Sequence, residues 1–312
     1  MSSLNPKSGP GAPAWIAIIV LGLVAAGLVV FALRSDPVPN AGERPSVVVT
    51  PSPSDVSRPA TPAPQPSSIT PQASTTKIIM GTSSVGVRSS SEPCEQGDPP
   101  VIEVSSDGGA SWSPAPIEPD AAVFEVLGGQ VVGEDQIDLV VRTGPQCALN
   151  VLTSYTGGQF WQLYPERISE QSFVDRLSPS TVTIKGRQVP SPCSAPLQIV
   201  DSGAEPVVRC VEGLFGYSAD SATWHVIAPI DSQSVAVSGS VAFAANTGVQ
   251  GCDGVSLQKI ALDGTSVQGE PLACVRADQP QPSVSITAVG SELWLWSDDS
   301  IVVSGDQGET WN

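Results

Sequence analysis

Two octapeptides decide the fold: SSDGGASW at residues 105–112 and SGDQGETW at residues 304–311. Both fit the pattern Ser-x-Asp-x-Gly-x-x-Trp, and each follows a short run rich in β-branched residues. The segment SYTGGQFW at residues 154–161 fits with Thr in place of Asp, and SADSATW at residues 218–224 is a copy that is one residue short and lacks the glycine. A strand-and-turn unit that recurs along a chain is the sequence signature of a repeat architecture.

The spacing of these copies indicates the kind of repeat. A fifth, more degraded copy is ALDGT at residues 261–265, so the Asp or its equivalent falls at positions 107, 156, 220, 263 and 306. The intervals of 49, 64, 43 and 43 residues bracket the 40–50 residues of a four-stranded propeller blade. We expect an all-β propeller of about five blades, divided at 76–118, 119–167, 168–230, 231–280 and 281–312.

The motif resembles the Asp box, or BNR repeat, of sialidases and related β-propellers. Asp and Ser side chains accept hydrogen bonds from turn amides, Gly supplies positive φ, and the Trp packs beneath its own turn. In that family the box is structural and lies away from the active face, so the resemblance implies a structural role for its residues here. The residues concerned are Ser105, Asp107, Gly109, Trp112, Ser154, Thr156, Gly158, Trp161, Asp220, Trp224, Ser304, Asp306, Gly308 and Trp311.

The N-terminal quarter, residues 1–75, has a different character. Residues 14–33 form an uncharged apolar run whose length of 20 residues, at about 1.5 Å each, matches the hydrocarbon core of a bilayer. Residues 34–75 are rich in Pro, Ser and Thr and cannot bury a core. We expect a cytoplasmic tail at 1–13, an uncleaved single transmembrane helix, a disordered stalk and an external domain from 76 to 312. This arrangement resembles wall-spanning surface proteins of Gram-positive bacteria.

The cysteines support an external location for the domain. All six lie at or beyond position 94, and an even number suits disulfides, which persist outside the cytoplasm. Two pairs are symmetric about likely hairpin turns, and the remaining two precede the motif strands of neighbouring blades. The expected bridges are Cys94–Cys147, Cys193–Cys210 and Cys252–Cys274.

Catalytic motifs are absent from the sequence. The Arg-Ile-Pro segment of sialidases does not occur, and no zinc spacing, phosphate loop or Gly-x-Ser-x-Gly elbow is present, so no catalytic, metal or cofactor residues are assigned. The single histidine, His225, is expected to be structural. Acidic pairs such as Glu134-Asp135 are expected in solvated turns. The side chains of Trp294 and Trp296 are expected to pack between neighbouring blades.

The composition excludes one class of function. The net charge of −17 argues against nucleic-acid binding, which needs clustered Lys and Arg. The sequence favours a membrane-anchored, non-catalytic propeller that binds a protein or glycan at the cell surface. Two alternatives stay open: an extracytoplasmic glycoside hydrolase of sialidase-like type, and an assembly factor for a membrane complex.

Overall fold

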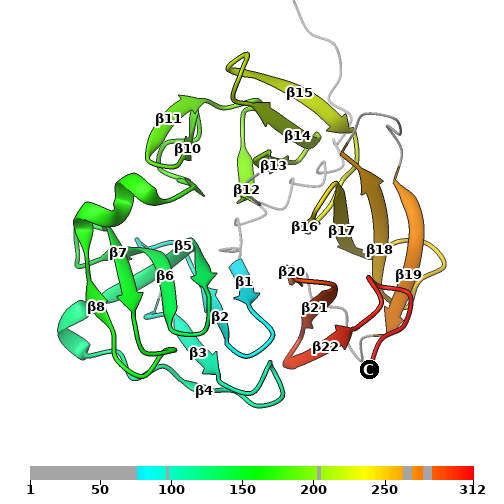
Figure 1. Ribbon diagram of the computed structural model, residues 1–312. Helices are drawn as coiled ribbons and strands as arrows, with labels where there is room; N and C mark the ends of the chain where they lie inside the picture. The colour runs from blue at the N-terminus through cyan, green and yellow to red at the C-terminus, as the bar shows by residue number, and fades with distance from the viewer. Residues whose placement is uncertain (1–75, 96–97, 202–204, 263–268, 277–282) are drawn as a thin grey trace, which may run out of the picture. The chain divides into compact units, whose positions relative to one another are not determined.

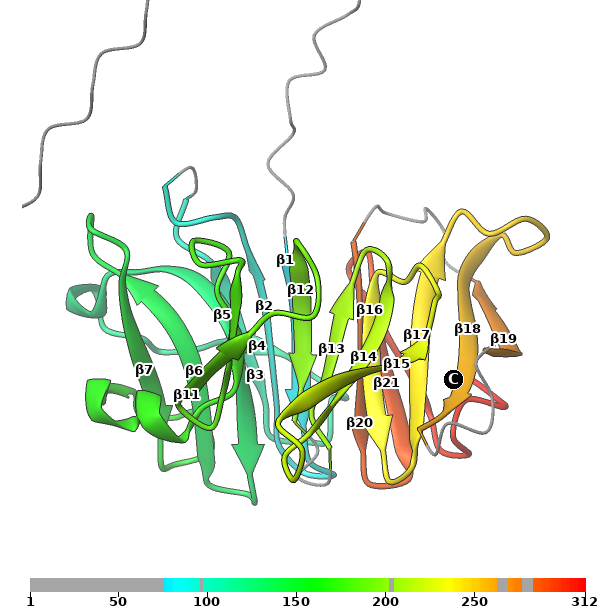
Figure 2. The same ribbon diagram turned by 90° about the horizontal axis from the view of Figure 1, so that it is seen from above.

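The computed structural model describes residues 76–312, apart from 96–97, 202–204, 263–268 and 277–282. Within these residues six small antiparallel sheets stand around a central axis like the blades of a propeller (Figure 1, Figure 2). The expectation of an all-β propeller is confirmed. Among the same residues no helix has the length and apolar character that crossing a bilayer requires. The expected span at 14–33, with the tail and stalk on either side of it, lies outside the described residues.

The first two blades have four strands each. Blade 1 contains β1 (Thr76–Gly81), β2 (Gly86–Ser91), β3 (Val101–Ser105) and β4 (Ser113–Pro114). After a 3-10 turn, η1 (Pro119–Ala121), blade 2 contains β5 (Val123–Val132), β6 (Gln136–Thr143), β7 (Ala148–Ser154) and β8 (Gln162–Leu163). In both blades the first strand lies nearest the axis and each later strand lies further out (Figure 1).

The remaining blades vary this plan. Blade 3 has three strands, β9 (Phe173–Val174), β10 (Thr181–Ile184) and β11 (Arg187–Pro190), and follows the 3-10 helix η2 (Pro165–Glu170). Blade 4 contains β12 (Pro196–Val200), β13 (Val207–Cys210), β14 (Gly213–Ser218) and β15 (Thr223–Ala228). Blade 5 contains β16 (Ser234–Ser238), β17 (Val241–Thr247), β18 (Gly254–Ala261) and β19 (Glu270–Arg276). Blade 6 contains β20 (Val284–Val289), β21 (Glu292–Ser297) and β22 (Ser300–Ser304).

The expectation of five blades is therefore wrong. The segment 168–230, which the motif spacing predicts to be a single blade, holds blades 3 and 4. Blade 3 carries no copy of the Trp-ending motif, so motif counting cannot detect it. Its sheet has only three strands, and the helix η2 that precedes it in the chain packs against β7 of blade 2.

Because blade 3 has three strands instead of four, its innermost strand, β9, runs opposite to the innermost strands of its neighbours. Ser172, just before β9, donates a hydrogen bond to Asp201, just after β12, at 2.7 Å. Arg176, two residues after β9, donates to Thr76, the first residue of β1. β9 thus begins beside the end of β12, and β9 ends beside the beginning of β1. β9 is antiparallel to both, which brings η2 and its last residue, Glu170, to the mouth of the channel where β12 ends.

The core consists of apolar layers between neighbouring blades. One cluster joins blades 1 and 2 around Ile137 and Leu139, and another joins blades 5 and 6 around Phe243 and Leu295. The ring closes between blades 6 and 1, where the buried Trp294 meets Trp112 edge to face, with ring centroids 6.3 Å apart. This is the inter-blade position that the sequence predicts for Trp294.

Three disulfides join Cys94 to Cys147, Cys193 to Cys210 and Cys252 to Cys274, which are the expected pairs. The first connects blade 1 to blade 2. The second spans the β12–β13 hairpin, and the third links β19 to the segment that precedes β18. The described residues contain no free cysteine.

Candidate functional site

The motif turns share one pattern of hydrogen bonds. In the first, the Gly109 amide donates to Ser105 Oγ at 2.8 Å, the Ser111 amide to Asp107 Oδ1 at 2.8 Å, and Trp112 Nε1 to the Gly109 carbonyl at 3.0 Å. The turns at 154–161 and 304–311 repeat all three bonds, with Thr156 Oγ1 as the acceptor in the former. The Ser, Asp and Thr side chains thus supply the hydrogen-bond acceptors that the turn amides would otherwise lack.

The acidic members of these turns are fully engaged. Hydrogen bonds from the side chain and backbone of Ser111, with a third from Ser105, lower the pKa of Asp107 to about 2. Thr310 and Ser304 do the same for Asp306. None of the motif residues lines the cavity described below. In the shortened copy, Trp224 Nε1 donates instead to the Pro190 carbonyl, and Asp263 of the fifth copy lies outside the described residues.

Other residues considered from sequence also lie away from the axis. His225 is on the outer strand β15, with Nε2 3.3 Å from Glu205 Oε1. Trp296 is covered by Lys77 and Arg88, whose charged groups lie 4.7 and 5.1 Å from its ring centroid, so it is packed at the ring closure and offers no open stacking face. Glu134 and Asp135 lie in the exposed turn between β5 and β6.

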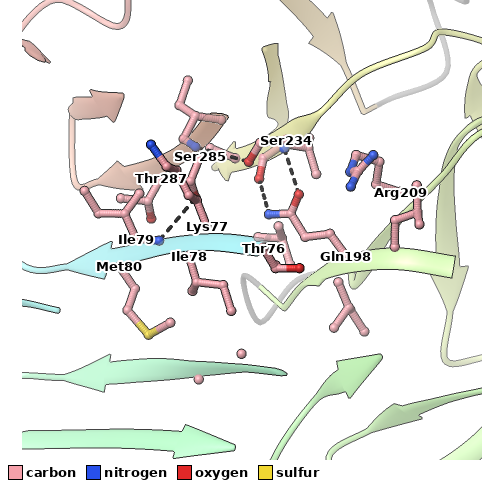
Figure 3. Close-up of a pocket in the computed structure, with 18 of the residues that line it drawn as sticks. Thr76, Lys77, Ile78, Ile79, Met80, Gln198, Arg209, Ser234, Ser285 and Thr287 are labelled. Carbon is pink, nitrogen blue, oxygen red and sulfur yellow. Dashed lines mark hydrogen bonds between the residues drawn. The ribbon is translucent and has the colours of Figure 1, made fainter. Parts of the chain in front are cut away.

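A cavity of about 810 Å³ occupies the centre of the ring. The innermost strands of five blades, β1, β5, β12, β16 and β20, contribute to its wall, and blade 3 contributes residues that flank its strands, such as Ser172 and Arg176. Figure 3 shows part of this wall, in which Lys77 and Ile79 of β1 lie on the side toward Ser285 of β20, and Ile78 and Met80 extend from the other side of β1. Gln198 of β12 and Ser234 of β16 lie beside the beginning of the strand (Figure 3). The volume is in the range of pockets that hold small ligands.

Polar side chains connect the innermost strands across this wall. Ser285 Oγ accepts a hydrogen bond from the Ile79 amide at 3.2 Å, and Ser234 Oγ accepts one from the Ile286 amide at 3.1 Å. Gln198 binds both the amide and the carbonyl of Val235, at 2.9 Å each (Figure 3). These bonds satisfy backbone groups that no neighbouring strand can reach, and they fix the width of the channel.

The mouth at the end of β12, called the end mouth below, carries two carboxyl groups. Asp201 accepts a hydrogen bond from Ser172 Oγ at 2.7 Å, and Lys185 Nζ lies 4.0 Å from its other oxygen. Glu170, the last residue of η2, pairs with Arg167 at 2.9 Å and its side chain is 57% exposed. Both acids line the cavity, together with Gln171, whose buried Nε2 has no hydrogen-bond partner among the residues that the structure describes.

The opposite mouth, where β1, β12 and β16 begin, is called the start mouth. Arg209 Nη1 donates to the Ser232 carbonyl at 2.6 Å, just before β16. Burial lowers the pKa of Arg209 to about 10; Asp231 opposes the shift and the charge of Arg176 adds to it. The guanidinium is nevertheless charged at neutral pH. Figure 3 shows Arg209 at the edge of the cavity, beyond Ser234.

Sequence reasoning missed the residues of both mouths. They come from five separate segments, and none belongs to a recognisable motif. Four of the ten Lys and Arg residues beyond position 75 line this cavity, but only the folded ring shows which four. These four are Lys77, Arg176, Lys185 and Arg209.

Comparison with known proteins identifies similar folds only. No family model matches the chain, and no curated protein matches it. A variant of the GH43 protein BlXynB from Bacillus licheniformis has 11% identity and a TM-score of 0.35 over 75% of this chain and 49% of its own. The extracellular domain of the one-component system BT4673 from B. thetaiotaomicron has 11% identity and a TM-score of 0.40 over 78% and 33%. The Bacillus subtilis arabinanase Arb43A has 10% identity and a TM-score of 0.36 over 74% and 96%.

These neighbours correct one expectation. Two of the three are GH43 proteins, one of them an arabinanase, and they stand against the sequence-based preference for a non-catalytic binding module. At this level of identity the likeness concerns the fold alone, and the chain spans about half or less of the first two neighbours, so the chemistry must be argued from the cavity.

Proposed function

We propose that the protein is a glycoside hydrolase that uses Glu170 and Asp201 at the end mouth of the central cavity. The observation that carries the proposal is that two carboxyl groups, one at the end of η2 and one just after β12, line the same ligand-sized cavity. Glycosidases in general need such a pair, one group to protonate the leaving oxygen and one to act as base or nucleophile. The reversed strand β9 places η2, and with it Glu170, beside the end of β12.

The surroundings of the two acids suggest their roles. Asp201 is held by the Ser172 hydroxyl and faces the Lys185 ammonium, so its orientation is fixed before substrate binds. We assign it the role of base or nucleophile, which demands a fixed line of attack. Glu170 is largely exposed at the rim, where a leaving group departs to solvent, and we assign it the role of general acid.

The test is hydrolysis of a panel of aryl glycosides and polysaccharides by the full chain. Glu170→Gln and Asp201→Asn should each lower kcat by about 10²–10⁴-fold, the usual contribution of an acid or base. Glu166→Gln is the matched control, because Glu166 lies on the same short helix but does not line the cavity. Wild-type turnover in both cavity variants, or no turnover of any glycoside by the wild type, would refute the proposal.

We further propose that the chain is an Asp-box propeller. The support is the set of three bonds shared by the turns at 105–112, 154–161 and 304–311. Thr156 stands where the other two turns have Asp and supplies a single acceptor in place of a carboxylate. Thr156→Asp should therefore raise the melting temperature, and a lower value would count against this membership.

We also propose that residues 14–33 anchor the protein in the plasma membrane with the propeller outside. The support is the apolar length of this segment and the use of all six cysteines in disulfides. Protease added to intact, wall-stripped cells should remove the propeller and leave a membrane-embedded stub. Protection of the whole chain would contradict this topology.

A further inference from the structure

Three buried donor groups at the start mouth have no hydrogen-bond partner among the described residues. They are Arg209 Nε, Ser232 Oγ and Ser283 Oγ. All three residues line the central cavity. Ser232 and Ser283 each come just before an innermost strand, β16 and β20 respectively, and Arg209 binds the Ser232 carbonyl. Because a buried polar group without a partner costs free energy, such a cluster in a cavity wall indicates a site where a ligand would accept these hydrogen bonds.

The charge at this mouth favours an anion. Arg209 forms no ion pair with any described carboxylate, whereas the buried Arg142 pairs with Glu125 and Asp175. The charge of Arg176 is near enough to act on Arg209 and lies on the same cavity wall. Asp231 is the one carboxylate of this mouth among the described lining residues, and it lies beyond ion-pair distance of the guanidinium.

We propose that the start mouth is a binding site for a small oxyanion, a phosphate or a carboxylate group, held by Arg209, Ser232 and Ser283 with Arg176 at its edge. A guanidinium is a planar, permanently charged donor that matches phosphate and carboxylate oxygens. The serine hydroxyls supply further donors from adjacent blades. A metal cation would be repelled by the two arginines, and a neutral sugar would leave the guanidinium charge unpaired.

This site goes beyond the proposed hydrolysis and does not rest on it. The carboxyl pair Glu170 and Asp201 is at the end mouth, whereas the donor cluster is at the start mouth. Glu170→Gln should therefore abolish turnover and leave oxyanion binding intact. A failure of either proposal can thus be told apart from a failure of the other.

The experiment is titration of the full chain at constant ionic strength with inorganic phosphate, with glucuronate as the carboxylate arm and with glucose as the neutral arm. Affinity is measured by calorimetry, and thermal melting reports the stabilisation that a bound ligand produces. We expect phosphate or glucuronate, and not glucose, to bind. Whichever of the two binds more tightly identifies the class of oxyanion.

Three variants test the residues. Arg209→Gln should weaken oxyanion binding by about tenfold or more, the effect of losing a charge-assisted hydrogen bond. Ser283→Ala should weaken it by about threefold or more without changing the melting temperature of the free protein, because that hydroxyl has no partner to lose. Arg276→Gln, which removes one charge from the outer strand β19, is the matched control and should bind like the wild type.

Other outcomes would overturn the proposal. They are the absence of binding by either oxyanion, glucose binding as tightly as glucuronate, and equal affinities in Ser283→Ala and Arg276→Gln. If Arg209→Gln fails to fold because it loses its bond to Ser232, the Ser283→Ala result decides alone.

Discussion

Replacing Trp294 with alanine tests how the ring is held closed. Trp294 is on β21 of the last blade, and its side chain is fully buried. Its ring lies against three glycines of the first blade, Gly81, Gly86 and Gly109; a Cβ added at Gly86 would come within 2.8 Å of it. No other large side chain of the described residues occupies this junction so completely.

The expected loss follows from this burial. Truncating a buried Trp to Ala typically costs about 3–5 kcal/mol, which includes the cavity that remains. The edge-to-face contact with Trp112 belongs to the same loss. A domain of this size loses about 2–4 °C of melting temperature per kcal/mol. With a loss of about 4 kcal/mol, Trp294→Ala should melt about 8–16 °C below the wild type.

Thermal unfolding followed by far-ultraviolet circular dichroism measures this difference. Phe160→Ala is the control, because Phe160 is 73% exposed and should melt within about 1 °C of the wild type. Trp294→Phe, which keeps an aromatic ring, should fall between the two. A melting temperature of Trp294→Ala within about 2 °C of the wild type would mean that closure does not depend on this side chain.

Three further predictions concern the turns and the disulfides. The lowered pKa values of Asp107 and Asp306 mean that the two carboxylates stabilise the fold fully above pH about 4, and that this stabilisation is lost as the pH falls to about 2. The melting temperature of the double Asn variant should therefore fall less than that of the wild type between pH about 4 and about 2. Replacing Cys94 and Cys147 with alanine should lower the free energy of unfolding by about 2–5 kcal/mol in urea titrations, and an unchanged midpoint would contradict the bridge. Gly158→Ala should lower the melting temperature, because its φ of +90° is strained for alanine and the new Cβ would meet Val104 at 2.8 Å; a neutral result would refute this.

The sequence predicted those features that are encoded locally. The three complete motif turns are self-contained, since Ser105 and Asp107 accept bonds from amides at most four residues away. The hairpin disulfides depend on strands that are adjacent in the chain. Such features are visible in a short window, and the structure contains them as expected.

The cavity could not be predicted in this way. Its wall comes from segments of all six blades that are far apart in the sequence, and the pairing of Ser172 with Asp201 depends on the reversed direction of β9. That reversal follows from the absence of a strand, which leaves no positive signal in the sequence. Arg209 was equally inconspicuous, since only the folded ring shows that its guanidinium lacks a carboxylate partner.

The junction between the last blade and the first also has a consequence for the order of events during synthesis. The hydrogen bond between the Ile79 amide and Ser285 Oγ joins residues 206 positions apart. At about 5–20 residues per second, translation of the intervening segment takes roughly 10–40 s. Throughout that interval the side of β1 that will meet β20 has no partner from its own chain. A nascent polypeptide in this condition needs protection, such as a bound chaperone, to keep that strand from pairing with a neighbouring copy.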